Sequence, residues 1–274
     1  MTPLRDDGAD ACSDGAMHRG SCNCGAVRFT VDLEGPLQGP DACHCTKCRK
    51  ASGHYFASTD VPRSAVRIEG EELLTWYRSS EKVRRGFCRT CGSQLFWDPL
   101  HKDWLGIAMG AFDGPTQTSL RVHIFVADKG DYYALNDGLP QHAQLTVHIA
   151  RPAEAVYAFA SDPRNLPRWA AGLARSEVRE EGDAWIAEAP FGTVRIRFAP
   201  RNAEGVLDHD VTLESGEVVH NPMRVVPSGR VGESDFTFTL IRRPEMSDAQ
   251  FDEDRRAVEA DLQTLKRLLE SGEG

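Results

Sequence analysis

The sequence predicts two domains: a mostly β domain, followed by an α+β domain in which an antiparallel sheet curves around a long C-terminal helix. Three observations lead to this fold class. All eight cysteines lie before residue 92, short apolar runs separated by turns fill both halves, and one long amphipathic pattern closes the chain. A chain of 274 residues is also long enough for two domains that each bury a core.

The composition is that of a globular protein, with 41% hydrophobic and 27% charged residues and no apolar run long enough to cross a bilayer. Residues 1–17 carry several acidic side chains and no apolar stretch, so we expect a flexible leader, a cytoplasmic protein and no membrane partner. The net charge is −9, and neither half has a surplus of lysine and arginine over acidic residues. Nucleic acid is therefore not an expected partner.

The first half has the pattern of short strands joined by turns. Residues 26–33 alternate Val27, Phe29, Val31 and Leu33 on one face, and residues 94–97, 105–109 and 120–126 look similar. No segment of this half has the length and periodicity of a normal amphipathic helix. A Gly/Pro turn at 138–140 precedes a new strand at 145–149. We therefore predict a leader at 1–17, a first domain at 18–142 and a second domain at 143–271.

The second half continues with short helices at 152–159 and 163–169. Strands are predicted at 185–189, 193–198, 206–213, 218–225 and 234–241, and a long helix at 248–270. Ser247 and Gln250 form a capping-box pattern where this helix begins. Apolar side chains recur on one helix face at three- and four-residue steps: Phe251, Val258, Leu262, Leu265 and Leu269. A curved sheet that grips this helix is the simplest arrangement.

Seven of the cysteines form three clusters. These are Cys22-Asn23-Cys24, Cys43-His44-Cys45-Thr46-Lys47-Cys48 and Cys88-Arg89-Thr90-Cys91. In a reducing compartment such close spacings favour metal ligands over disulfides. A Cys-x-Cys segment presents two sulfurs on one side of an extended chain, and Cys-x-x-Cys-Gly bends into a knuckle. The clusters therefore predict zinc.

The seven thiolates divide naturally into four plus three. Structural zinc takes four protein ligands whereas catalytic zinc keeps one position open, so the numbers suggest two zinc ions per chain with different roles. Spacing alone leaves the pairing of the clusters open, although Cys43, Cys45 and Cys48 are the natural set of three. The closed site would then use Cys22, Cys24, Cys88 and Cys91. Cys12 lies outside this pattern, and we expect it to be a thiol of the leader.

Four segments carry a resemblance to a known family. GSCNCGAVRF, ACHCTKCRKASG, FCRTCGSQLFW and HIFVADKGDYYALNDGLPQ occur in the order and spacing typical of glutathione-dependent formaldehyde-activating enzymes and centromere-protein-V-like domains. The resemblance covers residues 18–142 and implies a mostly β zinc-binding domain. It also implies a structural zinc on the two outer cysteine pairs and a functional zinc on Cys43, Cys45 and Cys48.

The same resemblance implies glutathione, or a similar small thiol, as the molecule that takes the open position on the second zinc. The implied activity is that of a zinc-dependent carbon–sulfur lyase or S-(hydroxymethyl)glutathione synthase. The sequence identifies no catalytic residue. Lys47, Arg49 and Lys50 could attract the carboxylates of glutathione or be solvated surface charge. His44 is expected to face away from the metal, as a supporting or a surface group.

A non-catalytic alternative stays open at this point. Both metals could serve only to hold a small β domain together, and the first domain could then be an interaction platform beside a ligand-carrying or ligand-sensing second domain. Added glutathione separates the two hypotheses, because an inert zinc platform should not respond to it.

The second half resembles the polyketide cyclase/START-like (SRPBCC) superfamily in its opening strand, its PAEAVYAFASDPRNLPRW segment and its long last helix. The resemblance implies a helix-grip fold around an apolar cavity that holds a hydrophobic small molecule. The alternation along 206–213 places His209 on one face with Leu207, Val211 and Leu213, either as a packed core residue or as a ligand contact. Arg195 and Arg197 are expected to stay in solvent.

Overall fold

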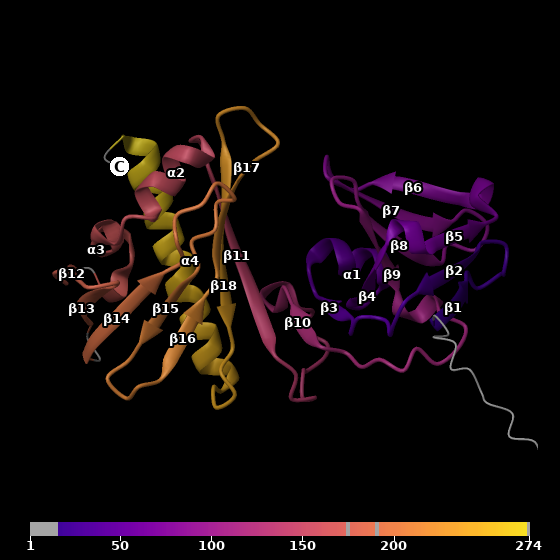
Figure 1. Cartoon of the computed structure of the whole chain (residues 1–274), viewed down its shortest axis with the longest axis horizontal. Helices are drawn as coiled ribbons and strands as arrows, with labels where there is room; N and C mark the ends of the chain where they lie inside the picture. Colours follow the sequence, from indigo (N-terminus) through magenta and orange to yellow (C-terminus); the bar gives the residue numbers. More distant parts are fainter. Residues whose placement is uncertain (1–15, 174–175, 190–191, 273–274) are drawn as a thin grey trace, which may run out of the picture. The chain divides into compact units, whose positions relative to one another are not determined.

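The computed structural model describes residues 16–173, 176–189 and 192–272 (Figure 1). Contacts divide the chain into unit 1, Met1–Asp41 with Phe56–Arg121, and unit 2, Ala42–Tyr55 with Val122–Gly274. The segment with Cys43, Cys45 and Cys48 belongs to unit 2, and the other two cysteine clusters belong to unit 1. The domain limits at 18–142 and 143–271 stay a prediction. Most of the expected leader, including Cys12, lies outside the described residues, and residues 16 and 17 already belong to a strand.

Unit 1 is built from two antiparallel sheets. The first has the order β1 (Ala16–Ser21), β2 (Arg28–Leu33) and β5 (Val66–Glu69). The second has the order β4 (Phe56–Pro62), β9 (Trp104–Ala108), β8 (Gln94–Pro99), β7 (Val83–Cys88) and β6 (Leu74–Arg78). Three short 3-10 turns are η1 (Arg63–Ala65), η2 (Glu71–Leu73) and η3 (Met109–Ala111). The predicted alternation is confirmed at Val27, Phe29 and Val31, which are buried, whereas Leu33 is only partly covered.

Unit 2 contains the remaining elements. In chain order, its first elements are β3 (Asp41–Cys43), α1 (Thr46–Ser52), β10 (Val122–Ile124), η4 (Val126–Asp128) and β11 (Gln141–Ile149). The chain continues with α2 (Ala153–Ala160), η5 (Pro163–Asn165), α3 (Leu166–Trp169), η6 (Ala171–Leu173), β12 (Arg179–Glu181), β13 (Ala184–Ala189), β14 (Gly192–Phe198), β15 (His209–Thr212), β16 (Val218–Asn221), β17 (Met223–Pro227), β18 (Ser234–Ile241) and α4 (Asp248–Ser271).

The strands of unit 2 form two groups. Strands β12 to β16 make an antiparallel meander, and β17, β18 and β11 pair antiparallel while β10 pairs parallel to β11. The single strand predicted over 218–225 was wrong, because Pro222 separates β16 from β17. Proline has no N–H for a ladder, and the two strands on either side of it pair with different neighbours, β15 and β18.

Helix α4, drawn in yellow in Figure 1, lies against β11. The predicted capping box is present: the Ser247 side chain accepts from the Gln250 N–H, and the Gln250 side chain accepts from the Ser247 N–H. Gly272, at φ 81°, ends the helix in the left-handed conformation that glycine tolerates. The predicted apolar face is confirmed, since Phe251, Leu262, Leu265 and Leu269 are buried and Val258 packs against the same core. Among the described residues, no helix is long and apolar enough to span a membrane.

His209, on β15, is a packed residue. Its side chain is only 9% exposed and stacks on Phe198 with ring centroids 4.7 Å apart. Its Nδ1 donates to the carbonyl oxygen of Leu207 at 3.4 Å. Burial lowers the pKa of His209 to about 4. The imidazole is therefore neutral at neutral pH, as its apolar surroundings require.

Because burial disfavours the protonated imidazole of His209, we expect acid to lower the free energy of unfolding of unit 2. His209 takes up a proton near pH 6.5 in the unfolded chain but only near pH 4 in the folded chain. The stability that comes from burying the neutral imidazole is therefore fully present above pH 6.5 and is lost as the pH falls toward 4. The full loss is about 3 kcal/mol of unfolding free energy. His209→Gln should flatten the pH dependence measured by urea unfolding between pH 7 and pH 5. His220→Gln is the matched control, since that histidine is exposed on β16 and pairs with Asp210. Parallel pH profiles for wild type and His209→Gln would contradict the prediction.

Candidate metal centres

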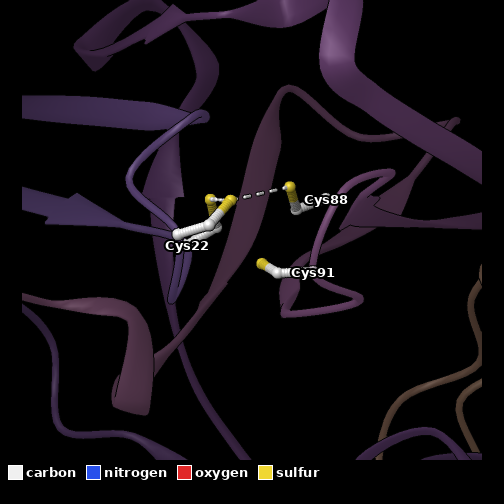
Figure 2. A group of neighbouring side chains, drawn as sticks. Cys22, Cys88 and Cys91 are labelled. Carbon is white, nitrogen blue, oxygen red and sulfur yellow. Dashed lines mark hydrogen bonds between the residues drawn. The ribbon is translucent and has the colours of Figure 1, made fainter.

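The four-cysteine group gathers in unit 1 from two loops. Cys22 and Cys24 lie in the turn between β1 and β2, Cys88 is the last residue of β7, and Cys91 lies in the turn between β7 and β8. The four sulfurs all lie within 4.8 Å of one another, with 3.5 Å between Cys22 and Cys24 and 3.8 Å between Cys24 and Cys88. Figure 2 shows the thiols of Cys22, Cys88 and Cys91 turned toward a common point. Tetrahedral zinc at ordinary Zn–S distances places its sulfurs about 3.8 Å apart, so this group fits one ion.

Two glycine turns shape the loops that carry these thiols. Gly25, at φ 71°, donates its N–H to the Cys22 carbonyl, and Gly92, at φ 75°, donates to the Cys88 carbonyl. Only glycine adopts such left-handed backbone without strain. The hydroxyl of Ser93 accepts from the Asn23 N–H and lies 3.2 Å from the Cys91 sulfur, which links the two loops.

The electrostatics of this group also favour a cation. Burial opposes the Cys22 thiolate, but the Val27 N–H and the thiols of Cys24 and Cys88 outweigh it and lower its pKa. Ser93 lowers the pKa of Cys91 to about 5 through its hydroxyl and N–H. The Ala26 N–H favours the Cys24 thiolate, but Cys22, burial and the other thiols raise the pKa of Cys24 to about 12. Thiolates this close repel one another, and a divalent ion removes that repulsion.

The three-cysteine group lies where β3 meets α1 in unit 2. Cys43 ends the strand, Cys45 caps the helix by accepting the Cys48 N–H at 3.4 Å, and Cys48 lies in the first turn. Their sulfurs lie within 4.8 Å of one another. Hydrogen bonds from the thiols of Cys43 and Cys48 hold the pKa of Cys45 low, at about 2. Hydrogen bonds with Cys45 and Cys48, together with burial, raise the pKa of Cys43. The group supplies three sulfur donors, one fewer than a closed tetrahedral site needs.

His44, between two of these cysteines, is completely buried, so the alternative of a surface group was wrong. Its Nδ1 bonds the Tyr133 hydroxyl, and its Nε2 lies 2.9 Å from Nδ1 of His123. His123 in turn bonds Asp137 through Nε2 at 2.8 Å. Both ring nitrogens of His44 are thus engaged away from the sulfurs, as the sequence suggested for a supporting group.

One proton arrangement satisfies this whole chain of hydrogen bonds. His123 lowers the pKa of Asp137 by hydrogen bonding, which outweighs the opposing effect of burial, so Asp137 accepts from His123 Nε2–H. In this arrangement His123 accepts at Nδ1 from His44 Nε2–H, and His44 accepts at Nδ1 from the Tyr133 O–H. Burial, helped by nearby positive groups, lowers the pKa of His44 to about 4 and keeps it neutral. This series of hydrogen bonds holds the backbone between Cys43 and Cys45 in one orientation.

Sequence reasoning missed His123, Tyr133 and Asp137. All three lie in the HIFVADKGDYYALNDGLPQ segment, which served only as a family signature. Rings of His54 and Tyr55 complete the surroundings: the His54 and Tyr133 centroids are 4.3 Å apart, and those of His44 and Tyr55 are 5.2 Å apart. The contacts of His44 with His123 and Tyr133 span 79 and 89 positions and have no local sequence signal, so only the polar residues of that segment could have suggested them.

Comparison with known proteins decides the family. Residues 17–128 match the family model described as glutathione-dependent formaldehyde-activating enzyme. A protein of Halomonas elongata named for the same family is 30% identical over 122 residues, which are 41% of this chain and 77% of the relative. The chain belongs to this family. A second relative of that name, from Penicillium rubens, is 34% identical over 100 residues, which cover 35% of this chain and 52% of its own length.

The C-terminal half lies outside the formaldehyde-activating family match and is similar to a second family. Residues 140–270 match the family described as polyketide cyclase / dehydrase and lipid transport. Among solved structures, the Zhui aromatase/cyclase from Streptomyces sp. R1128 is 18% identical with a TM-score of 0.36, covering 49% of this chain and 99% of its own. The chain thus joins a formaldehyde-activating-enzyme domain to a cyclase-like domain.

Proposed function

We propose that this chain interconverts glutathione plus formaldehyde and S-(hydroxymethyl)glutathione, as a zinc-dependent carbon–sulfur lyase or synthase. The observation that carries the proposal is the three-cysteine group, which offers three sulfur ligands and leaves one position for an outside thiol. The family match and the names of the relatives support glutathione and formaldehyde as the substrates.

Two zinc ions per chain are part of the proposal. Cys22, Cys24, Cys88 and Cys91 would hold a structural ion, and Cys43, Cys45 and Cys48 would hold the functional one. Zinc, when bound, lowers the pKa of a thiol that joins it, which supplies a thiolate at neutral pH. The reaction itself balances without an oxidant: the sulfur–carbon bond forms, the carbonyl π bond opens, and the thiol proton ends on the former carbonyl oxygen.

The residues around the three-cysteine group hold its sulfur ligands in place. The Asp137–His123–His44 hydrogen bonds hold the segment between Cys43 and Cys45, and the Cys48 N–H holds the Cys45 sulfur. Ligands whose positions are fixed by such bonds need no reorganisation when the substrate arrives.

For the C-terminal half we propose binding of a hydrophobic small molecule. Its support is the cyclase and lipid-transport family match over 140–270 and the apolar face that α4 turns toward the strands. Binding of this kind and the thiol chemistry are separate activities of one chain.

The test uses the purified full chain under reducing conditions. Elemental analysis should give two zinc ions per chain, and two-dimensional exchange NMR should show faster interconversion of glutathione and its hydroxymethyl adduct than in buffer. Glutathione should also perturb the absorption of a cobalt-substituted protein through the three-cysteine group. Two zinc ions with no rate enhancement and no response to glutathione would overturn the enzyme and favour the non-catalytic interaction platform.

A further inference from the structure

A cavity of about 360 Å³ lies within unit 2, and residues of the loop 129–136 form part of its lining. Arg242 and the first two turns of helix α4 form another part. Cavities that hold small molecules measure about 300–1,000 Å³, so this one is large enough for a small organic molecule. The two family matches cover residues 17–128 and 140–270, and neither includes the loop. Neither family therefore accounts for this cavity.

The basic side chains of the cavity are more buried than its acidic ones. Lys129, Arg242 and Arg255 line it, and the side chains of the two arginines are 20% and 25% exposed. Asp248 and Asp252 also line it, but their side chains are 92% and 54% exposed. A half-buried cation has lost part of its water, whereas an exposed carboxylate keeps its own. The arrangement favours an anion inside the cavity.

Arg255 has a hydrogen-bond donor to offer to such an anion. Its Nε donates to Asp252 at 3.3 Å, and its Nη1 donates to Glu259 at 2.7 Å. Its other terminal nitrogen, Nη2, bonds no acceptor within the described part of the chain. Exposed ion pairs of this kind contribute at most about 1 kcal/mol, so a ligand carboxylate can share the guanidinium at little cost. The planar fork of a guanidinium also matches a carboxylate.

Lys129 offers a second donor from the loop. Its Nζ donates to the carbonyl oxygens of Gly130 at 3.2 Å and Tyr133 at 2.8 Å, which fixes the position of the ammonium. An ammonium has three N–H donors, so one remains for a ligand. Over residues 16–173, 176–189 and 192–272, no carboxylate pairs with Lys129. Asp131, which also lines the cavity, is exposed.

Apolar side chains complete the lining. Val126 and Phe251 are buried, and Leu135 packs against the same core. We propose that this cavity binds a small organic acid, whose carboxylate Arg255 and Lys129 hold and whose hydrocarbon part lies on these apolar side chains. None of the seven clustered cysteines lines the cavity, so the inference goes beyond the proposed thiol chemistry and does not depend on it.

The test compares two probes of the same shape, 2-naphthoate and the uncharged 2-naphthamide, by calorimetry on the zinc-loaded full chain. One 2-naphthoate should bind per chain, about tenfold more tightly than 2-naphthamide, as expected for one charged hydrogen-bonded contact. Arg255→Gln and Lys129→Gln should each weaken 2-naphthoate about tenfold and leave 2-naphthamide unchanged. Arg255→Lys should recover part of the affinity, because it restores the charge without the fork.

Arg256→Gln is the matched control, since it removes a charge from the same turn of α4 at an exposed position outside the cavity. Cys45→Ser removes a ligand of the proposed functional zinc and should leave 2-naphthoate binding unchanged, so this inference and the proposed activity can fail separately. Melting temperatures show whether the variants are folded, and the comparison of acid and amide on wild type decides the matter if they are not.

Four results would overturn the proposal. These are equal binding of acid and amide to wild type, no binding of either probe, equal losses in Arg255→Gln and Arg256→Gln, and loss of 2-naphthoate binding in Cys45→Ser. The last result would place the carboxylate on the metal instead of in the cavity.

Discussion

Cys22→Ser should unfold unit 1 under conditions in which the wild-type chain is stable. Cys22 is 2% exposed, its sulfur accepts the Val27 N–H at 3.2 Å, and it faces three other thiols, two of which come from the separate β7–β8 hairpin. A closed structural zinc contributes its binding energy to folding, on the order of 10 kcal/mol in small zinc modules. Serine is a poor zinc ligand, so most of that contribution should be lost.

Urea unfolding, monitored by tryptophan fluorescence, measures this loss of stability, because Trp76, Trp97 and Trp104 all belong to unit 1. Elemental analysis should give one zinc ion for the variant and two for wild type. Cys45→Ser is the matched control, since it removes one thiol from the other group. Similar losses of unfolding free energy in the two variants would mean that the structural and functional roles have been assigned wrongly.

Cys45→Ser should abolish the proposed activity while unit 1 remains folded. Cys45 both contributes a sulfur to the three-cysteine group and caps α1, so its loss removes a ligand and a helix cap together. Replacement of groups that only support metal ligands already costs 10- to 100-fold, so loss of a ligand should lower the rate by about 100-fold or more.

Exchange NMR of the glutathione adduct gives the rate, and the unfolding curve of unit 1 shows that the effect is local. Cys12→Ser is the control, since it removes a cysteine that lies outside the three sequence clusters. A rate within a few-fold of wild type in Cys45→Ser, with one zinc ion lost, would show that the chemistry does not depend on this group.

Much of the fold follows from local patterns that the sequence displays. The capping box at Ser247, the spaced apolar face of α4 and the alternation at Val27, Phe29 and Val31 each involve residues a few positions apart. Strand limits were less accurate: the strand expected at 206–213 is regular only over His209–Thr212, and that at 120–126 only over Val122–Ile124. Beyond these limits Val206 forms only an isolated bridge with Arg224, and Val126 already belongs to the 3-10 turn η4.

The sequence by itself determined the thiol clusters, because i,i+2 and i,i+3 spacing places neighbouring sulfurs on one side through backbone geometry alone. Only the tertiary structure decided which clusters meet, since Cys24 and Cys88 are 64 positions apart. It also decided that His44 is buried against His123 and Tyr133. Burial and long-range hydrogen bonds depend on which surfaces the folded chain brings together, and no local pattern of residues encodes that choice.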